Sequence, residues 1–203
     1  MMVTLTADQQ DALQELMNVA MGGASDQLAR FLNTFIHLQV PAIQVIEACS
    51  VPEQLARIYV DDGTRLVSQG FMGSVGIQGE AMLLYNMAST HQLAGVLGYQ
   101  QDDTSESEML SDISSILTTT FLNSLSAQLD SSLSYSAPRL LSCQPSELKQ
   151  RLTELSERWT AALQVNIHYQ VTDYAFNCEM ILLIPGSALN TLQQQLNLIL
   201  QEF

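Results

Sequence analysis

The sequence predicts an α/β fold of the α+β type. In this fold a duplicated helix–strand–strand–strand–helix unit builds one mostly antiparallel sheet, which packs with two long helices. Long amphipathic segments and short segments rich in Val, Ile and Leu alternate in the same order in both halves of the chain. Residue spacings repeat as well, because Pro41 follows Asn18 by 23 residues and Pro138 follows Ser115 by the same interval. The chain is therefore predicted to be a pseudo-twofold duplication.

The first half is predicted to begin with one long amphipathic helix over residues 5–34. Thr6 is the expected N-cap, because Gln9 stands three residues later and completes a capping box. Segments rich in β-branched residues and a glycine-rich turn follow the helix. The other elements of this half are expected as follows: a strand over 37–47, a helical turn after Pro52, strands over 64–73 and 75–86, a helix over 88–98 and a polar linker over 101–107.

The second half is predicted to repeat this order, starting with a long helix over residues 106–130. The buried stripe of this helix is expected to consist of Leu110, Ile113, Leu117 and Phe121. The other elements are expected as follows: a strand over 133–143, a helix over 145–158, strands over 162–172 and 176–184, and a terminal helix over 187–202. We therefore expect one domain over residues 1–203, with repeat halves of about 5–100 and 105–203.

The composition excludes several classes of protein. Of the 203 residues 47% are hydrophobic, which is enough for one substantial core. The formal net charge is -14, and a surface of that sign repels nucleic-acid backbones and anionic lipid. We expect no nucleic-acid partner, no transmembrane helix and no signal peptide, and hence a cytoplasmic protein.

Several residue groups indicate no chemistry of their own. The cysteines are widely spaced among apolar neighbours, and we expect them to be reduced core residues: Cys49, Cys143 and Cys178. The histidines have no metal-ligand spacing, so no metal site is predicted from His37, His91 and His168. Four glycines with a period of three lack the lysine and helix of a phosphate loop, and we interpret them as strand and turn residues: Gly70, Gly73, Gly76 and Gly79.

The most informative pattern is Asp11-x-x-x-Glu15-x-x-Asn18 on the first long helix. Steps of four and three residues place these side chains on one face of the helix, so Glu15 and Asn18 should be exposed and point the same way. Small residues are expected to continue this face: Gly22, Ser25 and Ala29. Apolar residues are expected on the opposite, buried side: Leu13, Leu16, Met17, Ala20 and Phe31. The pattern predicts a polar surface that a partner can approach closely.

The same pattern is also what the solvated face of any amphipathic helix contains. One feature that favours a functional motif is Asn18, because Asn is a poor helix-interior residue whose side chain competes for backbone hydrogen bonds. Another is the proline at the same distance in both halves. The second long helix carries a weaker copy, Glu108-x-x-x-Asp112-x-x-Ser115, which keeps the geometry but not the chemistry.

Together with the proline, the pattern resembles the signature of the CheC/CheX/FliY family of response-regulator phosphatases. That signature is Asp or Ser, three residues, Glu, two residues, Asn, 22 residues and Pro, and it is matched by Asp11, Glu15, Asn18 and Pro41. The segment that continues the motif, NVAMGGASDQLARFL, resembles the corresponding segment of the family less closely, because Ala20 and Gly23 stand where the family prefers Gly and Asn. In the second half Asp112 replaces the Glu and Ser115 replaces the Asn.

The resemblance implies a CheC-like fold and a phosphatase that acts in trans on the phospho-aspartate of a CheY-like receiver domain, in chemotaxis or two-component signalling. It implies that Glu15 and Asn18 are catalytic. Asp11 and Gly22 would then bind the receiver, while a degenerate second site would remain at Asp112 and Ser115. No cofactor of its own is expected, because the receiver would supply Mg2+.

The chemistry of the side chains agrees with these roles. A neutral amide both donates to and accepts from water without carrying charge towards a phosphoryl group, so Asn18 is predicted to position the attacking water. Glu15 is predicted to pair with a cation on the receiver, which the resemblance identifies as the receiver's active-site lysine, and Asp11 is predicted to be a docking or helix-start residue.

Other functions remain open at this point. The alternative is a non-catalytic adaptor that binds a receiver or a CheD-type deamidase, and the degenerate second helix favours it. A flagellar-switch component is a third possibility, for which no extra segment for switch assembly is visible.

Overall fold

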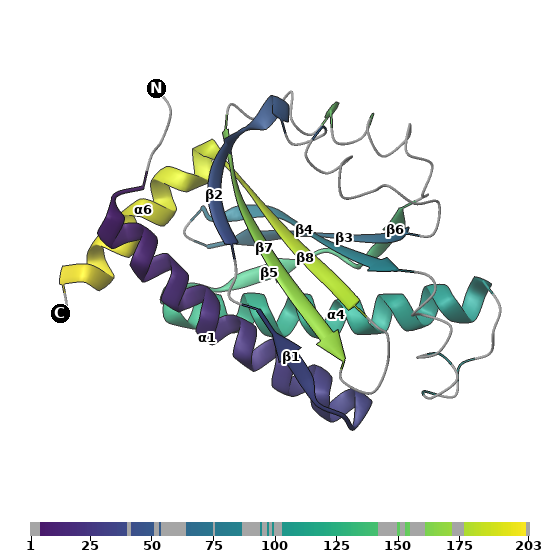
Figure 1. Cartoon of the computed structure of the whole chain (residues 1–203). Coiled ribbons are helices and arrows are strands. Elements are labelled where there is room, and N and C mark those ends of the chain that lie inside the picture. The colour runs from purple at the N-terminus through teal and green to yellow at the C-terminus, as the bar shows by residue number, and fades with distance from the viewer. Residues whose placement is uncertain are drawn as a thin grey trace.

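The structure is a computed structural model, and it describes residues 5–39, 42–50, 53, 64–74, 76–86, 94, 97, 99, 103–141, 150, 153–154, 161–171 and 177–201. Its long elements run in the predicted order (Figure 1). The helices are α1 (Ala7–Leu32), η1 (Ala48–Ser50), α4 (Asp103–Gln128) and α6 (Gly186–Gln201). The strands are β1 (Ile36–Leu38), β2 (Ala42–Glu47), β3 (Thr64–Gly73), β4 (Gln78–Asn86), β5 (Leu133–Tyr135), β6 (Arg139–Leu141), β7 (Ala161–Val171) and β8 (Asn177–Pro185).

The eight strands form one sheet, and each pairing among the described strands is antiparallel. The strand order is β1-β7-β8-β4-β3-β5, with β2 also paired to β7 and β6 also paired to β3. At the centre β4 and β8 pair in the register Leu83 to Met180. The predicted antiparallel sheet is confirmed.

The two halves of the sequence exchange their outer strands. β1 and β2 come from the first half, yet they pair with β7 of the second half. β5 and β6 come from the second half and pair with β3 of the first. The duplicated, pseudo-twofold arrangement is confirmed, and it relates the two outer pairs across the central β4–β8 pairing. The exchange itself was not predicted from the sequence.

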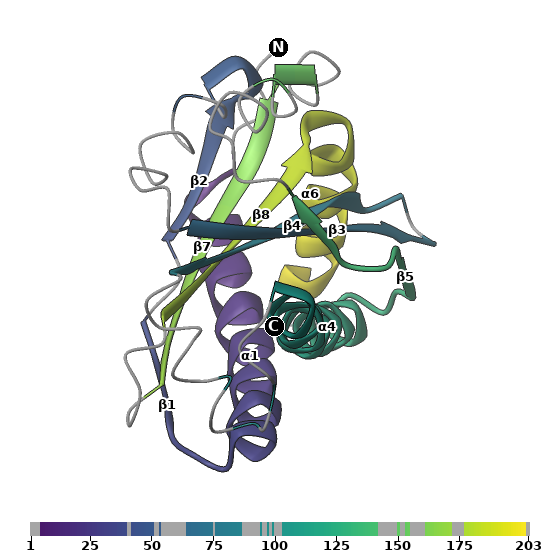
Figure 2. The same ribbon diagram turned by 90° about the vertical axis from the view of Figure 1, so that its right-hand side faces the viewer.

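Helices α1, α4 and α6 cover one face of this curled sheet (Figures 1 and 2). Alternate strand residues point towards the helices, as the period of two requires, and Leu83 and Val165 are fully buried there. α1 and α4 pack on each other, and the Gln128 side-chain amide donates to the Leu16 carbonyl oxygen at 3.1 Å. The predicted buried stripe of α4 is confirmed, because each of its members is 0% exposed: Leu110, Ile113, Leu117 and Phe121.

The structure corrects some predicted boundaries. The prediction of a linker over 101–107 was wrong for residues 103–107, because α4 begins at Asp103. Asp, Ser and Glu are as typical of a helix start as of a linker. The single strand over 133–143 was also wrong, because it is divided into β5 and β6 with Pro138 between them. Proline lacks the N–H that a ladder needs. The strand over 37–47 is likewise two short strands, β1 and β2.

The cysteines divide into two environments. Cys178 is free and buried, as predicted. Cys49 is free and exposed, so its assignment to the core was wrong. It lies in η1 at the end of β2, where its thiol donates to a Glu47 carboxylate oxygen at 3.7 Å. Several predictions lie outside the described residues, wholly or for the most part: Cys143, His91, the turn after Pro52 and the helices over 88–98 and 145–158.

Candidate functional site on helix α1

Helix α1 carries the predicted motif, but its start is held by residues outside that motif. The Gln9 backbone N–H donates to the Thr6 hydroxyl oxygen at 3.2 Å, and the Thr6 backbone N–H donates to the Gln9 side-chain oxygen at 3.0 Å. The predicted capping box is thereby confirmed. Asn33 ends the helix in the left-handed region, with φ 50°. Asp11 lies in the second turn, beyond the cap, which leaves docking as its predicted role.

The motif residues form an exposed stripe along α1. We call Asp11, Glu15, Asn18, Val19 and Gly22 the α1 stripe. Asp11, Glu15 and Gly22 are exposed, which confirms the prediction for Glu15. Asn18 was also predicted to be exposed, but it is half-buried, because it lies on the edge of the exposed face next to the core side. On the opposite side the predicted burial is confirmed for Leu13, Leu16, Met17 and Ala20. The helix therefore separates its core side from its polar side, as the spacing predicted.

Val19 is the member of the stripe that sequence reasoning missed. Its side chain is 49% exposed, although it is β-branched and apolar. It lies four residues after Glu15 and next to Asn18, so the same helical spacing could have identified it. A single exposed apolar residue is common, but this one lies between the two polar groups and the open surface at Gly22.

The polar side chains of the stripe make no polar contacts of their own with the rest of the described chain. Within the part of the chain that the structure describes, Asp11, Glu15 and Asn18 make no side-chain hydrogen bond or ion pair. The nearest ion pair on the same helix is Asp26 with Arg30, at 2.8 Å between Arg30 Nε and Asp26 Oδ2. The donors and acceptors of the motif are thus available to a second molecule.

Gly22 keeps the surface beside Asn18 open. A Cβ atom built at Gly22 would meet nothing within 4 Å. A Cβ at the neighbouring Gly23 would lie 3.9 Å from the Ser124 side chain of α4. The two adjacent glycines therefore face different surroundings. Gly22 faces open space and Gly23 faces the contact between the two long helices.

The sequence predicted the wrong exposure for two residues of α1. Ser25 was expected on the open face, but it is only 7% exposed. The exposed stripe is centred nearer Val19 and Gly22, which puts Ser25 on its buried flank. Phe31 was expected in the core, but it is 39% exposed, because it lies in the last turn of the helix. Pro41, the last residue of the motif, lies outside the described residues.

Helix α4 presents a corresponding stripe with the same geometry. We call Glu108, Asp112, Ser115 and Thr119 the α4 stripe. Glu108 and Asp112 are exposed and Ser115 is half-buried, which is the burial order of Asp11, Glu15 and Asn18. Thr119 takes the place that Gly22 has on α1, four residues after the third motif residue, and its hydroxyl donates to the Ser115 carbonyl oxygen at 2.6 Å.

The carboxylate of the α4 stripe is already bound within the chain. The Tyr99 hydroxyl donates to Asp112 Oδ2 at 2.6 Å. This hydrogen bond, with smaller effects from burial and from the charges of Asp112 and Glu108, raises the pKa of Tyr99 to about 12. Sequence reasoning missed Tyr99, because nothing in the local pattern relates it to a residue thirteen positions later on α4.

The α1 stripe has the chemistry of a group that assists a reaction on another molecule. It offers one amide, two carboxylates and an open patch on the outer face of a helix. Residues three and four apart on a helix have Cβ atoms about 5–6 Å apart, so Glu15 and Asn18 can contact neighbouring groups of one partner. An exposed helix face excludes no water by itself, so a partner must complete the site.

Comparison with known proteins supports the resemblance stated from the sequence. Residues 9–45 match the model of the CheC-like family, and this segment contains the whole motif from Asp11 to Pro41. No curated protein matches the sequence. The predicted resemblance to the CheC/CheX/FliY family is confirmed by this match together with the structural likenesses below.

Three crystal structures illustrate the shared fold. Thermotoga maritima FliY has a TM-score of 0.70 at 17% identity, covering 96% of this chain and 98% of that chain. FliM in a FliG–FliM complex from H. pylori has a TM-score of 0.61 at 10% identity, covering 94% and 100%. A complex of CheX with CheY, BeF3 and Mg2+ from Borrelia burgdorferi has a TM-score of 0.54 at 15% identity, covering 84% and 96%. These likenesses confirm the CheC-like fold.

Among the described residues, no helix combines the length and the apolar character that a membrane crossing requires.

Proposed function

We propose that the protein is a phosphatase that acts in trans on the phospho-aspartate of a CheY-like receiver domain, with one working site on the α1 stripe. The observation that carries the proposal is the pair of an exposed Glu15 and a half-buried Asn18 on one helix face, both without partners among the described residues. The segment that matches the CheC-like family model includes this pair. A structure of similar fold was solved with CheY, which supports a receiver as partner.

The proposed mechanism gives each side chain one task. Asn18 holds a water molecule in line with the phosphorus–oxygen bond, accepting from the water with its Oδ1 and donating with its Nδ2. The water oxygen bonds to phosphorus while the bond from phosphorus to the aspartate oxygen breaks. The water proton passes to the phosphate, and the receiver keeps its free carboxylate. Since the receiver brings its own Mg2+, no metal is required from the α1 stripe.

Glu15 and Asp11 are proposed to fix the position of the receiver. A carboxylate one helical turn from the amide pairs with a lysine of the receiver in a charge-assisted hydrogen bond. Gly22 and Val19 provide the closest approach and an apolar contact beside the reacting group. Because the charges lie on an exposed face, this docking should weaken as the salt concentration rises.

The experiment that tests the proposal measures the lifetime of the phosphoryl group. Receivers from the same cell are phosphorylated with acetyl phosphate, the excess is removed, and phosphate release is followed with and without the protein. We expect faster release with at least one receiver. If phosphate is released at the receiver's own rate, for each receiver and at each protein concentration, the proposal that the protein is a phosphatase is wrong.

An adaptor is the second candidate, and the likeness to FliM favours it, because that protein was solved in a complex with FliG. An adaptor would bind the receiver, or a CheD-type deamidase, through the same fold without hydrolysis. The two candidates separate in the lifetime assay. An adaptor binds the phosphorylated receiver and leaves its phosphate lifetime unchanged or longer, whereas a phosphatase shortens it.

A further inference from the structure

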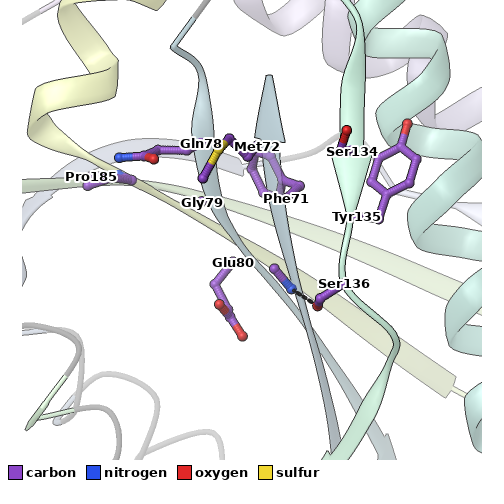
Figure 3. Close-up of a pocket in the computed structure, with 10 residues that line it drawn as sticks. Phe71, Met72, Gln78, Gly79, Glu80, Ser134, Tyr135, Ser136 and Pro185 are labelled. Atoms are coloured by element: carbon purple, nitrogen blue, oxygen red, sulfur yellow. Dashed lines mark hydrogen bonds between the residues drawn. The ribbon is translucent and has the colours of Figure 1, made fainter. Parts of the chain in front are cut away.

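The face of the sheet that points away from the helices has a cavity of its own. It has a volume of about 430 Å3 and lies beside the β3–β4 hairpin and β5 (Figure 3). Pockets for small ligands have volumes of about 300–1,000 Å3. Its described lining includes Gly70, Met72, Gln78, Glu80, Ser136 and Pro185. The α1 stripe lies on the helical side, so this cavity is a separate site.

Gly70 creates the hollow. On β3 the neighbouring Val67 and Phe71 belong to the core on the helix side, so Gly70 faces the other side. It pairs with Glu80 of β4, and its backbone N–H donates to the Ser136 hydroxyl oxygen at 3.0 Å. A Cβ atom at Gly70 would lie 3.5 Å from Glu80 Oε2 and 3.6 Å from Ser136 Oγ. The missing side chain therefore leaves a space between a carboxylate and a hydroxyl group.

The charge of the cavity comes from Glu80, the only carboxylate in its described lining. One carboxylate oxygen, Oε1, accepts a hydrogen bond from the Ser68 hydroxyl. No ion pair between Glu80 and another described residue is formed, so Oε2 faces the hollow without a cation. Next to it Met72 is 63% exposed, and Figure 3 shows Met72, Gln78 and Pro185 grouped at one end of the cavity.

This combination selects a ligand with an apolar stem and a cationic end. A long basic side chain places its methylene groups against apolar surface and its charge at a polar end. A guanidinium group is more weakly hydrated than an ammonium group and offers several donors in one plane, which suits a mostly apolar cavity with one carboxylate. The formal net charge of -14 attracts a basic partner to the protein as a whole.

We propose that this cavity binds an arginine side chain of a partner protein, with the stem against Met72 and Pro185 and the guanidinium on Glu80 Oε2. The protein then has two binding faces. One is the α1 stripe on the helical side, and the other is this arginine site on the opposite side of the sheet. The second face does not depend on whether the α1 stripe is catalytic.

The first experiment uses the complete chain labelled with 15N and a probe that resembles an arginine in a peptide, N-acetyl-L-arginine N-methylamide. We expect chemical-shift changes centred on the amides of Gly70, Gly79 and Glu80. The matched probe is the citrulline analogue, which has nearly the same shape but no charge. The citrulline analogue should bind at least about 10-fold more weakly than the arginine probe, which is the size of a lost charge-assisted hydrogen bond. Equal binding of the two probes would overturn the proposal.

Two variants test the cavity itself. Glu80→Gln keeps an acceptor for Ser68 and removes the charge, and Gly70→Ala places a methyl group in ordinary contact distance of Glu80 and Ser136. Each should weaken binding of the arginine probe by about 10-fold or more. Glu108→Gln removes the same charge on α4 and should leave the binding constant unchanged. If Glu80→Gln folds, as judged by its amide spectrum, and binds like the wild type, the assignment is wrong.

Two further probes test the identity of the ligand. The corresponding lysine amide should bind more weakly than the arginine amide, and equal affinity would overturn the choice of arginine. Agmatine has the same guanidinium group at one end of an alkyl chain and a free amine at the other, so it represents a free small molecule and not a side chain of a protein. Binding of agmatine about 10-fold tighter than the arginine amide would indicate a free small molecule and would overturn the assignment to a partner protein. If a variant fails to fold, the comparison of arginine with citrulline on the wild type decides alone.

Discussion

The α1 and α4 stripes have nearly the same geometry but differ in what is bound to them. Each lies on a helix of 26 residues, and the three motif positions have the same order of exposure on both. On α1 the polar groups have no partner among the described residues, and a glycine leaves open space beside them. On α4 Tyr99 binds Asp112, and Thr119 replaces that glycine. Duplication preserves helical spacing, but the surrounding residues decide whether a face is available.

The same contrast extends to the next turn of α4. Asn123 is exposed, and its side-chain oxygen accepts a hydrogen bond from the Tyr135 hydroxyl. Two tyrosines thus hold polar groups along α4. A partner that docks on α4 must break a hydrogen bond and pass a threonine, whereas a partner that docks on α1 meets neither obstacle. If one stripe is used, α1 is the one that costs less to desolvate.

The largest expected effect distinguishes Asn18 from Ser115. Asn18→Ala should reduce receiver dephosphorylation on the order of 10²-fold or more, because one preorganised water-binding group is lost. Binding and stability should change little, since alanine is a better helix former than asparagine. Ser115→Ala, at the same position on α4, should change the rate hardly at all. Phosphate release measured for both variants in parallel checks this, and equal losses would show that the active helix was assigned wrongly.

A gain of function on α4 is the next test of the comparison. In the Asn18→Ala background, Asp112→Glu and Ser115→Asn restore the motif residues, Tyr99→Phe frees the carboxylate, and Thr119→Gly opens the surface. We expect dephosphorylation to rise above the Asn18→Ala background only when all four changes are combined, because each removes a separate obstacle. If restoring Asp112→Glu and Ser115→Asn alone gives the full rise, the tyrosine and threonine are not obstacles.

Much of this arrangement could be predicted from the sequence, because it depends on local periodicity. The cap at Thr6, the exposure of Glu15 and the burial of Leu13 follow from helical spacing and capping rules. The contact from Tyr99 to Asp112 could not, because it joins a residue before α4 to the helix surface. The pairing of β1 with β7 could not either, since strand partners far apart in sequence are not set by local pattern.

The errors follow the same division. The angle of Phe31 around the helix axis places it on the apolar stripe, but it lies in the last turn and is 39% exposed. A helical wheel gives only the angle of a residue, and not whether the end of the helix is covered by the core. The cavity at Gly70 was also missed, although the glycine was correctly predicted as a strand residue. What makes it a site is the register that brings Glu80 and Ser136 to either side of it.

A smaller effect should separate the two adjacent glycines of α1. Gly22→Ala and Gly23→Ala should each stabilise the protein by about 1 kcal/mol, because alanine is the better helix former and neither Cβ meets a close contact. Only Gly22→Ala should weaken receiver binding, because its methyl group would stand on the open face. Thermal unfolding and a receiver titration check both. Unchanged binding of Gly22→Ala would remove Gly22 from the docking surface.

The smallest effect concerns the tyrosine that holds α4. The hydrogen bond to Asp112 raises the pKa of Tyr99 from 10.0 to about 12, so the folded state favours the protonated phenol. The stabilisation it contributes is therefore fully present below pH 10 and is lost as the pH rises through about 12. Asp112→Ala should lower this pKa towards 10, with the part of the rise caused by burial remaining, as measured by NMR titration of the tyrosine ring carbons. Glu108→Gln should lower it less, because that charge is the smallest of the causes. A wild-type Tyr99 that titrates near 10 would mean that the bond does not form in solution, and the α4 stripe would then be as open to a partner as the α1 stripe.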